Sequence, residues 1–323
     1  MDNTLVIGVD LGGTHAYAGV VNTSGEVLLR KETDIDTSLD ADVIIKQMIV
    51  PTIKSAIEEK KEFSGRIKAV GLGAPGSHDS KRGICHFSPN FRWRNVEVTR
   101  PIEEELGIPV YMLNDVRTAA LGEKHFGAGK DVSDFVIMAI GTGIGGGVVL
   151  DKRLILGVNE VAGEIGHITV DPDGHQCNCG NYGCMEAMAS GPNIARRGRE
   201  AMLENRDSKL WNMVEHINDV SARTLYDAAR NEDTTALKVW EDTGRYLGIG
   251  MASIVHTVNP QRFIIGGRVA TAIDFFLPSL KEELNARATM VPRGSIEVVS
   301  AVLKENAGLV GSAALAFEKI EVL

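Results

Sequence analysis

The stretch that decides the fold reads Leu5-Val6-Ile7-Gly8-Val9-Asp10-Leu11-Gly12-Gly13-Thr14, an apolar run that ends in an acid and two glycines. It predicts a buried β-strand over residues 5–10, followed by a glycine turn. A second strand is expected over residues 16–21 and a third over residues 26–32, with a tight turn between them. This part of the chain therefore reads as a meander of strands rather than as a strand–turn–helix unit.

The same strand–glycine–strand pattern occurs again near the middle of the chain. An apolar run over residues 134–140 leads into Gly141-Thr142-Gly143-Ile144-Gly145-Gly146-Gly147, and the next strand is expected to reach residue 150. This weak internal repeat predicts two related α/β domains with a cleft between them. The other predicted elements are strands over 68–73, 110–113 and 262–265, and helices over 40–61 (bent or split at Pro51), 101–106, 117–126, 193–203, 222–230, 234–258 and 307–319.

Composition and charge limit the classes of function. The chain has 323 residues, of which 44% are hydrophobic, and this length suits two domains or one large one. The net charge is −9 and the sequence has no basic cluster, which argues against nucleic acid as a partner. The first residues do not resemble a signal peptide, and no apolar run approaches the roughly 18 residues of a membrane-spanning helix. Three of the four cysteines form one short cluster rather than a disulfide pattern, so we expect a cytoplasmic protein without a membrane partner.

The two glycine turns are candidates for binding the phosphates of a nucleotide. Glycines let the backbone turn tightly and approach phosphate oxygens, which accept hydrogen bonds from backbone N–H groups. In the first turn, Asp10 can hold the water shell of Mg²⁺, and Thr14 offers its hydroxyl group to a phosphate oxygen. An ordinary glycine hairpin is the alternative for each turn, and the chain has no Walker A motif. The candidate residues are Asp10, Gly12, Gly13 and Thr14 in the first turn and Gly141, Thr142 and Gly143 in the second.

Asn114 and Asp115 follow the apolar strand expected at 110–113, a position where α/β proteins place ligand-binding groups. Two interpretations of Asp115 are open. It is either the N-cap of the following helix or a general base that takes a proton from a substrate hydroxyl group. In the second case Asn114 would hold a neighbouring hydroxyl group of the substrate.

A cysteine cluster predicts a metal site. Cys177, Cys179 and Cys184 lie within eight residues, and His167 stands ten residues before the first of them. Three cysteines and one histidine supply the four ligands of a closed tetrahedral zinc site, which leaves no open position for a reactive water. A scatter of buried thiols is the alternative to a metal site, and His175 is the second choice for the histidine ligand.

Two acids flank this cluster. Glu164 precedes His167 by three residues, and Glu186 follows Cys184 by two. A metal ion that fixes the loop between these carboxylates would shape a substrate pocket rather than carry out the chemistry.

Taken in order, these features resemble the ROK family of sugar kinases over essentially the whole chain, and within that family they are most similar to the bacterial glucokinases. Besides the two glycine turns and Asn114-Asp115, the resemblance rests on Gly73-Ala74-Pro75-Gly76, Ser88-Pro89-Asn90-Phe91 and Ala119-Ala120-Leu121-Gly122-Glu123. Its most specific part is Glu164-Ile165-Gly166-His167 followed by a Cys-x-Cys-Gly-x-x-Gly-Cys-x-Glu motif at residues 177–186.

The resemblance implies an actin-like ATPase (ribonuclease H-like) α/β fold, in which two domains close on a hexose and on ATP with Mg²⁺. It implies that Asp115 is the catalytic base for the 6-hydroxyl group of the sugar. It agrees with a structural Zn²⁺ held by His167, Cys177, Cys179 and Cys184, and it places Gly266 and Gly267 near the adenine. The residues implied to contact the sugar are Ala74, Pro75, Gly76, Asn90, Asn114, Asp115, Glu164, His167 and Glu186.

The chain departs from the family's pattern at three places. Arg117 stands two residues after the base, where the family often has asparagine, and it would either alter the setting of the base or reach solvent. Arg268 follows Gly266-Gly267 in place of a third glycine, close to the expected adenine pocket. Arg92 changes the spacing between Asn90 and Trp93 in a loop that the family places near the sugar.

The resemblance implies ATP-dependent phosphorylation of D-glucose to glucose 6-phosphate in glycolysis, by a homodimer or homotetramer. Alternatives are a kinase for N-acetylmannosamine, N-acetylglucosamine, fructose or allose, and a sugar-responsive regulator. A regulator that binds DNA is disfavoured because the charge is negative and the first glycine turn lies close to Met1. The expected domains are residues 1–115, with a C-terminal helix at 305–323 packed on them, and residues 116–304 with the zinc loop.

Overall fold

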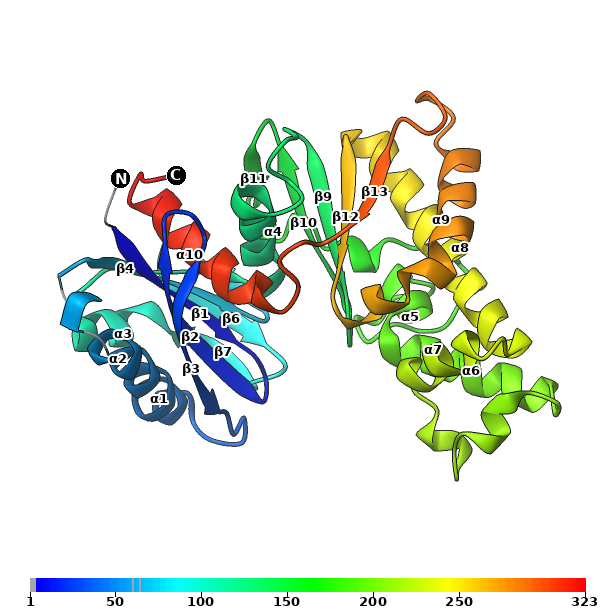
Figure 1. Ribbon diagram of the computed structural model, residues 1–323, viewed down its shortest axis with the longest axis horizontal. Helices are drawn as coiled ribbons and strands as arrows, with labels where there is room; N and C mark the ends of the chain where they lie inside the picture. The colour runs from blue at the N-terminus through cyan, green and yellow to red at the C-terminus, as the bar shows by residue number, and fades with distance from the viewer. Residues whose placement is uncertain (1–3, 60, 64) are drawn as a thin grey trace. The chain divides into compact units, whose positions relative to one another are not determined.

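The computed structural model describes residues 4–59, 61–63 and 65–323 (Figure 1). This chain divides into two compact units. Unit 1 comprises the described residues up to Ser133 together with Gly147–Ala162 and Ala301–Leu323. Unit 2 comprises Asp134–Gly146 and Gly163–Ser300.

A five-stranded mixed sheet forms the centre of unit 1. Its strands, in spatial order, are β3 (Val27–Asp34), β2 (His15–Asn22), β1 (Leu5–Leu11), β4 (Ile67–Ala74) and β8 (Val110–Asn114). β2 is antiparallel to both of its neighbours, β3 and β1, whereas β1, β4 and β8 run parallel. The predicted meander and the two later strands of the first half are therefore confirmed.

Alternate residues of β1 enter the cores on the two faces of this sheet. Leu5 and Ile7 belong to a core that includes the helical segment after β3 and α3 (Thr99–Leu106), whereas Val6 packs against α10 (Ala307–Lys319). This helix approaches the sheet closely because glycines face it. A Cβ on Gly8 would lie 2.1 Å from the carbonyl oxygen of Leu309, so a side chain at this position would push α10 away.

The helix predicted over residues 40–61 changes its hydrogen-bond register near Pro51. It consists of α1 (Ala41–Val43), a π-helical turn η1 (Ile44–Ile49) and α2 (Val50–Glu58). Within the π-helical turn, the N–H group of Val50 donates to the carbonyl oxygen of Ile45, five residues back. Because proline has no N–H group to donate, the predicted irregularity at Pro51 takes the form of a register change before it.

The helix after Asp115 belongs to unit 1, so the expected domain boundary at residue 115 does not coincide with the division of the structure. This helix, α4 (Asp115–Phe126), packs against α10 at glycines: a Cβ on Gly311 would lie 2.1 Å from the carbonyl oxygen of Thr118. The C-terminal helix also packs on the unit 1 sheet, where the sequence predicts it. A small antiparallel sheet that the sequence did not predict completes unit 1, with strands β5 (Ser77–Asp79), β6 (Ile84–Ser88) and β7 (Trp93–Glu97).

The second sheet has the order β11-β10-β9-β12-β13, and the division between the units passes within β10. Its strands β9, β12 and β13 are parallel, whereas β10 and β11 are antiparallel. The bounds are β9 (Phe135–Ile140), β10 (Ile144–Leu150), β11 (Arg153–Ile155), β12 (Arg262–Gly266) and β13 (Glu297–Ser300). The helices of unit 2 are α5 (Met185–Ala189), α6 (Gly191–Glu204), α7 (Ala222–Arg230), α8 (Thr234–Val258) and α9 (Ile273–Arg287).

Predicted helices α6, α7 and α8 are confirmed, whereas α9 and the short strands β11 and β13 were not predicted. Short 3₁₀ turns lie at Lys61–Phe63, Ile165–His167, Lys209–Asn212, Ile217–Asp219, Arg268–Ala272 and Lys304–Asn306. Within the described part of the chain, no helix has both the length and the apolar character needed to cross a bilayer.

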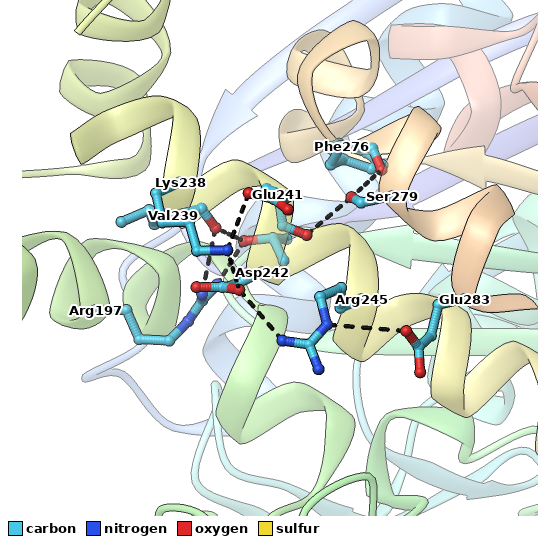
Figure 2. A network of polar contacts seen from close by, with 10 residues as sticks. Arg197, Lys238, Val239, Glu241, Asp242, Arg245, Phe276, Ser279 and Glu283 are labelled. Carbon is cyan, nitrogen blue, oxygen red and sulfur yellow. Dashed lines mark hydrogen bonds and ion pairs between the residues drawn. The ribbon is translucent and has the colours of Figure 1, made fainter. Parts of the chain in front are cut away.

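A polar network joins α6 and α8 in unit 2 (Figure 2). The guanidinium group of Arg197 donates to the carbonyl oxygens of Val239, at 3.2 Å, and Met188, at 3.0 Å, and its burial lowers the pKa of Arg197 to about 10. Because Met188 belongs to α5, this arginine fixes α5 against α8. Ion pairs continue the network along α8 and to α9, between Lys238 and Asp242, Arg245 and Asp242, and Arg245 and Glu283.

Candidate functional site

The carboxyl ends of three neighbouring parallel strands in unit 1 carry the predicted site residues. Asp10 near the end of β1 is in register with Gly73 of β4, and Ala74 of β4 is in register with Asn114 of β8. Since parallel strands end at the same edge of a sheet, this edge collects Asp10, the segment 74–76 and Asn114 with Asp115. The structure thus brings together residues that lie far apart in the sequence.

Asp10 and Asp115 are close enough for their charges to interact. Burial, and then the negative charge of Asp115, raise the pKa of Asp10 to about 6, while Arg30 acts in the opposite direction. The start of α10 also abuts Asp10, because a Cβ on Gly308 would lie 2.3 Å from the Asp10 carboxyl group. Sequence reasoning missed Gly308, since a small residue in a helix gives no signal of what lies against it.

The first glycine turn lies beside Asn90. The N–H group of Gly12 donates to the carbonyl oxygen of His15 at 2.9 Å, which closes the turn. The space above Gly13 is open, and the nearest atom to a Cβ placed there would be the side-chain amide nitrogen of Asn90, at 3.8 Å. Thr14 is exposed at the tip of the turn. The backbone at Gly13 therefore faces open space, with Thr14 exposed beside it.

Asn114, and not Asp115, is the N-cap of α4. Its side-chain oxygen accepts hydrogen bonds from the N–H groups of Val116, at 3.0 Å, and Arg117, at 3.3 Å. Its amide nitrogen donates to the carbonyl oxygen of Gly76 at 3.2 Å. The interpretation of Asp115 as the cap is wrong, because Asp115 already occupies the first helical position. With the cap supplied by its neighbour, Asp115 does not have to fill that role.

The second glycine turn, the start of α6 and the end of β12 lie together in unit 2. The N–H group of Gly141 donates to the carbonyl oxygen of Gly143 at 2.9 Å, and the N–H group of Gly191 donates to the carbonyl oxygen of Gly141 at 2.8 Å. Gly267 has a left-handed φ of 82°, and a Cβ on it would lie 2.3 Å from the carbonyl oxygen of Ile140. The predicted residues Gly141–Gly143, Gly266 and Gly267 thus share one edge, and Gly191 is an additional residue that sequence reasoning missed.

The cysteine cluster forms in the structure with the predicted histidine. The sulfurs of Cys177, Cys179 and Cys184 and a ring nitrogen of His167 all lie within 4.8 Å of one another. His175 instead lies 3.8 Å from the carboxylate of Glu200. The arrangement favours His167 over His175 as the fourth ligand.

The spacing of these atoms fits a tetrahedral metal ion. Two sulfurs that each lie about 2.3 Å from one zinc are about 3.8 Å apart at the tetrahedral angle. The sulfurs of Cys179 and Cys184 are 3.7 Å apart, and the sulfur of Cys177 lies 3.7 Å from Nδ1 of His167. Three thiols and one imidazole are also the donor types that zinc prefers. The residues present therefore fit a structural Zn²⁺.

Glu186 links this cluster to the second glycine turn. It lies in α5, which begins directly after Cys184, and one of its carboxylate oxygens is 3.7 Å from the sulfur of Cys177. The other accepts a hydrogen bond from the N–H group of Ile144 at 2.9 Å. A Cβ on Gly143 would lie 2.5 Å from this carboxylate, so a side chain there would displace Glu186. Glu164 is exposed just before the turn that carries His167.

A protein-family model for the ROK family matches residues 6–319. The chain belongs to the ROK family. It is 35% identical over 321 residues to a glucokinase of Thermotoga maritima, covering 99% of each chain. It is 30% identical to a putative xylose repressor of Caldicellulosiruptor sp., covering 96% of this chain and 77% of that one.

A solved structure of a ROK family glucokinase from Streptomyces griseus, in complex with glucose and AMPPNP, has the same fold. The two chains are 32% identical, the match covers 97% of this chain and 99% of that one, and the TM-score is 0.81. The predicted fold class, a two-part α/β fold of the ROK sugar kinases, is confirmed. In this ROK protein, unit 1 carries acids and an amide at strand ends, and unit 2 carries a cysteine–histidine cluster beside a glycine turn.

Proposed function

We propose that this ROK protein transfers the terminal phosphoryl group of ATP to the 6-hydroxyl group of D-glucose. The observation that carries the proposal is Asp115 at the carboxyl end of β8, with Asn114 capping the helix and reaching Gly76. The full-length similarity to glucokinases supports glucose as the sugar. In this proposal Asp115 accepts the proton of the 6-hydroxyl group as the oxygen attacks the phosphorus.

The other side chains of unit 1 position the sugar and the phosphates. We assign the sugar to the strand-end segment 74–76, to Asn90 and to the free donor capacity of Asn114, and the phosphate tail to the first glycine turn. Asp10 would hold Mg²⁺, which supplies charge neutralisation for the phosphates when it is bound. Support for this assignment is the shared strand edge and the open face of Gly13 beside Asn90.

Unit 2 supplies the second glycine turn and the metal cluster. We assign Gly141–Gly143 to the phosphates, Gly266 and Gly267 to the adenine side, and Glu164, His167 and Glu186 to the sugar. Zn²⁺ held by His167 and the three cysteines would be a scaffold, because four protein ligands leave no open position. The metal ion would fix the segment that carries Glu186. The carboxylate of Glu186 in turn accepts a hydrogen bond from the N–H group of Ile144.

The second candidate function is regulation by a sugar without catalysis, which the similarity to xylose repressors favours. The two functions differ in turnover. A panel of glucose, N-acetylmannosamine, N-acetylglucosamine, fructose, allose and xylose, assayed for ADP release from MgATP, distinguishes them. We expect ADP release with glucose as the best substrate. Binding of a sugar without ADP release would favour the regulator instead.

The first glycine turn gives a prediction that separates binding from folding. The nearest atom to a Cβ on Gly13 would be at an ordinary van der Waals distance, and the φ of Gly13 is not left-handed. Gly13→Ala should therefore leave the free energy of unfolding within about 0.5 kcal/mol of wild type. The added side chain of Gly13→Val should obstruct the approach of a phosphate and raise the KM for ATP at least about tenfold. The test measures steady-state kinetics and thermal unfolding of both variants and compares them with wild type. Unchanged ATP kinetics in a folded Gly13→Val protein would remove this turn from the nucleotide site.

The raised pKa of Asp10 predicts how stability depends on pH. In metal-free buffer the folded protein holds this proton up to about pH 6, whereas the unfolded chain loses it near the ordinary value of 3.8. The stabilisation is therefore present below about pH 4 and is lost as the pH rises through about 6. Asp10→Asn cannot ionise, so we expect it to be more stable than wild type at pH 7.5, by up to about 3 kcal/mol, with no such gain at pH 4. Urea unfolding across this range tests the prediction, and a gain that does not vary with pH would contradict it.

A further inference from the structure

Arg117 is buried in the first turn of α4, two residues after Asp115. The residue is 1% exposed, so the alternative that Arg117 reaches solvent is wrong. Two atoms of its guanidinium group donate to the same carbonyl oxygen, that of Ala162: Nε at 3.2 Å and Nη2 at 3.0 Å. A buried arginine that directs two donors to a loop carbonyl fixes the position of that loop.

The loop that it holds runs from Leu156 to Ala162 and is closed at its base. The N–H group of Ala162 donates to the carbonyl oxygen of Leu156 at 2.9 Å. Glu160, which has a left-handed φ of 54°, gives the loop a second anchor. Its carboxylate accepts hydrogen bonds from the N–H group of Ser80, at 2.9 Å, and from the hydroxyl group of Ser80, at 2.7 Å.

Polar contacts, rather than apolar packing, hold the outer part of this loop. Val158 is fully exposed and Val161 is 44% exposed, so neither anchors the loop in a core. A left-handed backbone at a residue other than glycine is unfavourable and persists only where surrounding contacts enforce it. The contacts of Glu160 with Ser80 and of Arg117 with Ala162 hold the loop at and after this left-handed residue, in addition to the backbone bond at its base.

Both anchors lead to segments that we assign to the sugar. Ser80 follows β5, whose His78 bonds the carbonyl oxygen of Ala74 through Nε2 at 2.9 Å. On the other side, Glu164 stands two residues after Ala162, and two residues of chain span at most about 7 Å. A fixed position of Ala162 therefore limits how far from it Glu164 can lie along the chain.

We propose that Arg117 and Glu160 are positioning residues for sugar recognition, which clamp the loop 156–162 and thereby set the place of Glu164. The inference rests on the proposed hexose kinase activity and deepens it. Because the contacts of the clamp given above are with the loop and with Ser80, its loss weakens sugar binding in the ground state and the transition state alike. Such a loss raises KM for glucose and leaves kcat nearly unchanged.

The test uses the full-length protein and four variants with one control. Arg117→Asn removes the guanidinium group, and Arg117→Lys keeps the charge but not the fixed geometry of two donors. Glu160→Gln and Ser80→Ala are milder changes. Glu160→Gln keeps one side-chain oxygen as an acceptor, and Ser80→Ala removes only the hydroxyl group and leaves the backbone N–H group to donate. Arg82→Asn is the matched control, since Arg82 is exposed in the turn between β5 and β6. Each protein is measured by steady-state kinetics and by amide hydrogen exchange of residues 157–162.

Arg117→Asn should raise the KM for glucose about tenfold, equivalent to about 1.4 kcal/mol, with kcat and the KM for ATP changed less than about threefold. Arg117→Lys, Glu160→Gln and Ser80→Ala should give smaller increases in the same parameter. Amide exchange in the loop should be faster in all four variants, with the largest increase in Arg117→Asn. It should be unchanged in Arg82→Asn.

Wild-type KM for glucose and wild-type loop exchange in Arg117→Asn would overturn the clamp. If Arg117→Asn does not fold, Glu160→Gln and Ser80→Ala decide, and wild-type values in both would overturn it. A fall in kcat without a rise in KM would also overturn it, because that result would place these residues in the chemical step. If the wild-type protein does not phosphorylate any hexose, the proposed function fails, and the same comparison made on glucose binding and loop exchange still decides the clamp.

Discussion

Asp115→Asn should lower kcat for glucose phosphorylation by about 10²–10⁴-fold, the range that general-base catalysis contributes. The loss should be confined to the chemical step. Asp115 accepts a hydrogen bond from the N–H group of Val116 at 2.9 Å through Oδ1, and the side-chain oxygen of asparagine can accept the same bond. Asn114 continues to cap α4 in the variant, so the helix should keep its start. The substitution removes the negative charge of Asp115 and with it the ability to take a proton.

The measurement compares kcat with glucose affinity in the same preparation. The dissociation constant for glucose, from calorimetry or intrinsic fluorescence, should change less than about threefold. Asp274→Asn serves as the control, since Asp274 is an exposed carboxylate in the first turn of α9 and should leave all parameters unchanged. A kcat near that of wild type in Asp115→Asn would show that another group takes the proton.

Cys179→Ser should lower the zinc content from about one ion per chain and should destabilise the protein strongly. Binding of a structural zinc supplies folding free energy, and apparent values for small zinc sites reach about 10–16 kcal/mol. Cys179 is the exposed member of the cluster, so its replacement changes the ligand set without opening a core cavity. The effect should reach both substrates. Glu186 lies two residues after Cys184 and holds the N–H group of Ile144 at the second glycine turn, so the KM for ATP should rise together with the KM for glucose.

Elemental analysis, thermal unfolding and kinetics of Cys179→Ser test this prediction together. Cys85→Ala is the matched control, because Cys85 is buried in the core of unit 1 and lies outside the cluster. It should keep its zinc even if it loses some stability. A metal-free wild-type protein with full activity and unchanged stability would contradict the role of zinc as a scaffold.

Local sequence patterns predicted the parts of the structure that local interactions decide. The glycine turn after Asp10 lies between two apolar strands, so hydrophobic alternation and turn chemistry agree there. The three cysteines lie within eight residues, which is why their clustering could be predicted from spacing. The helices over 222–230 and 234–258 have strong periodicity and were predicted with the bounds that the structure has.

Contacts between distant residues decided the rest. Glu160 bonds Ser80 across 80 positions of sequence, and nothing near either residue indicates the other. The burial of Arg117 depends on a carbonyl group 45 positions away. The cap of α4 was a different case, because Asn114 and Asp115 are both good N-caps and one residue of register decides between them. Gly308 could not be found at all, since its role is to leave space for Asp10.

Product analysis by ³¹P nuclear magnetic resonance of the purified protein with MgATP and D-glucose tests the central claim most directly. The account predicts that the resonances of ATP are replaced by those of ADP and glucose 6-phosphate in equal amounts, and that neither product forms when Asp115→Asn replaces the wild type over the same time. Release of inorganic phosphate in place of the sugar phosphate, or phosphate on another hydroxyl group, would contradict it.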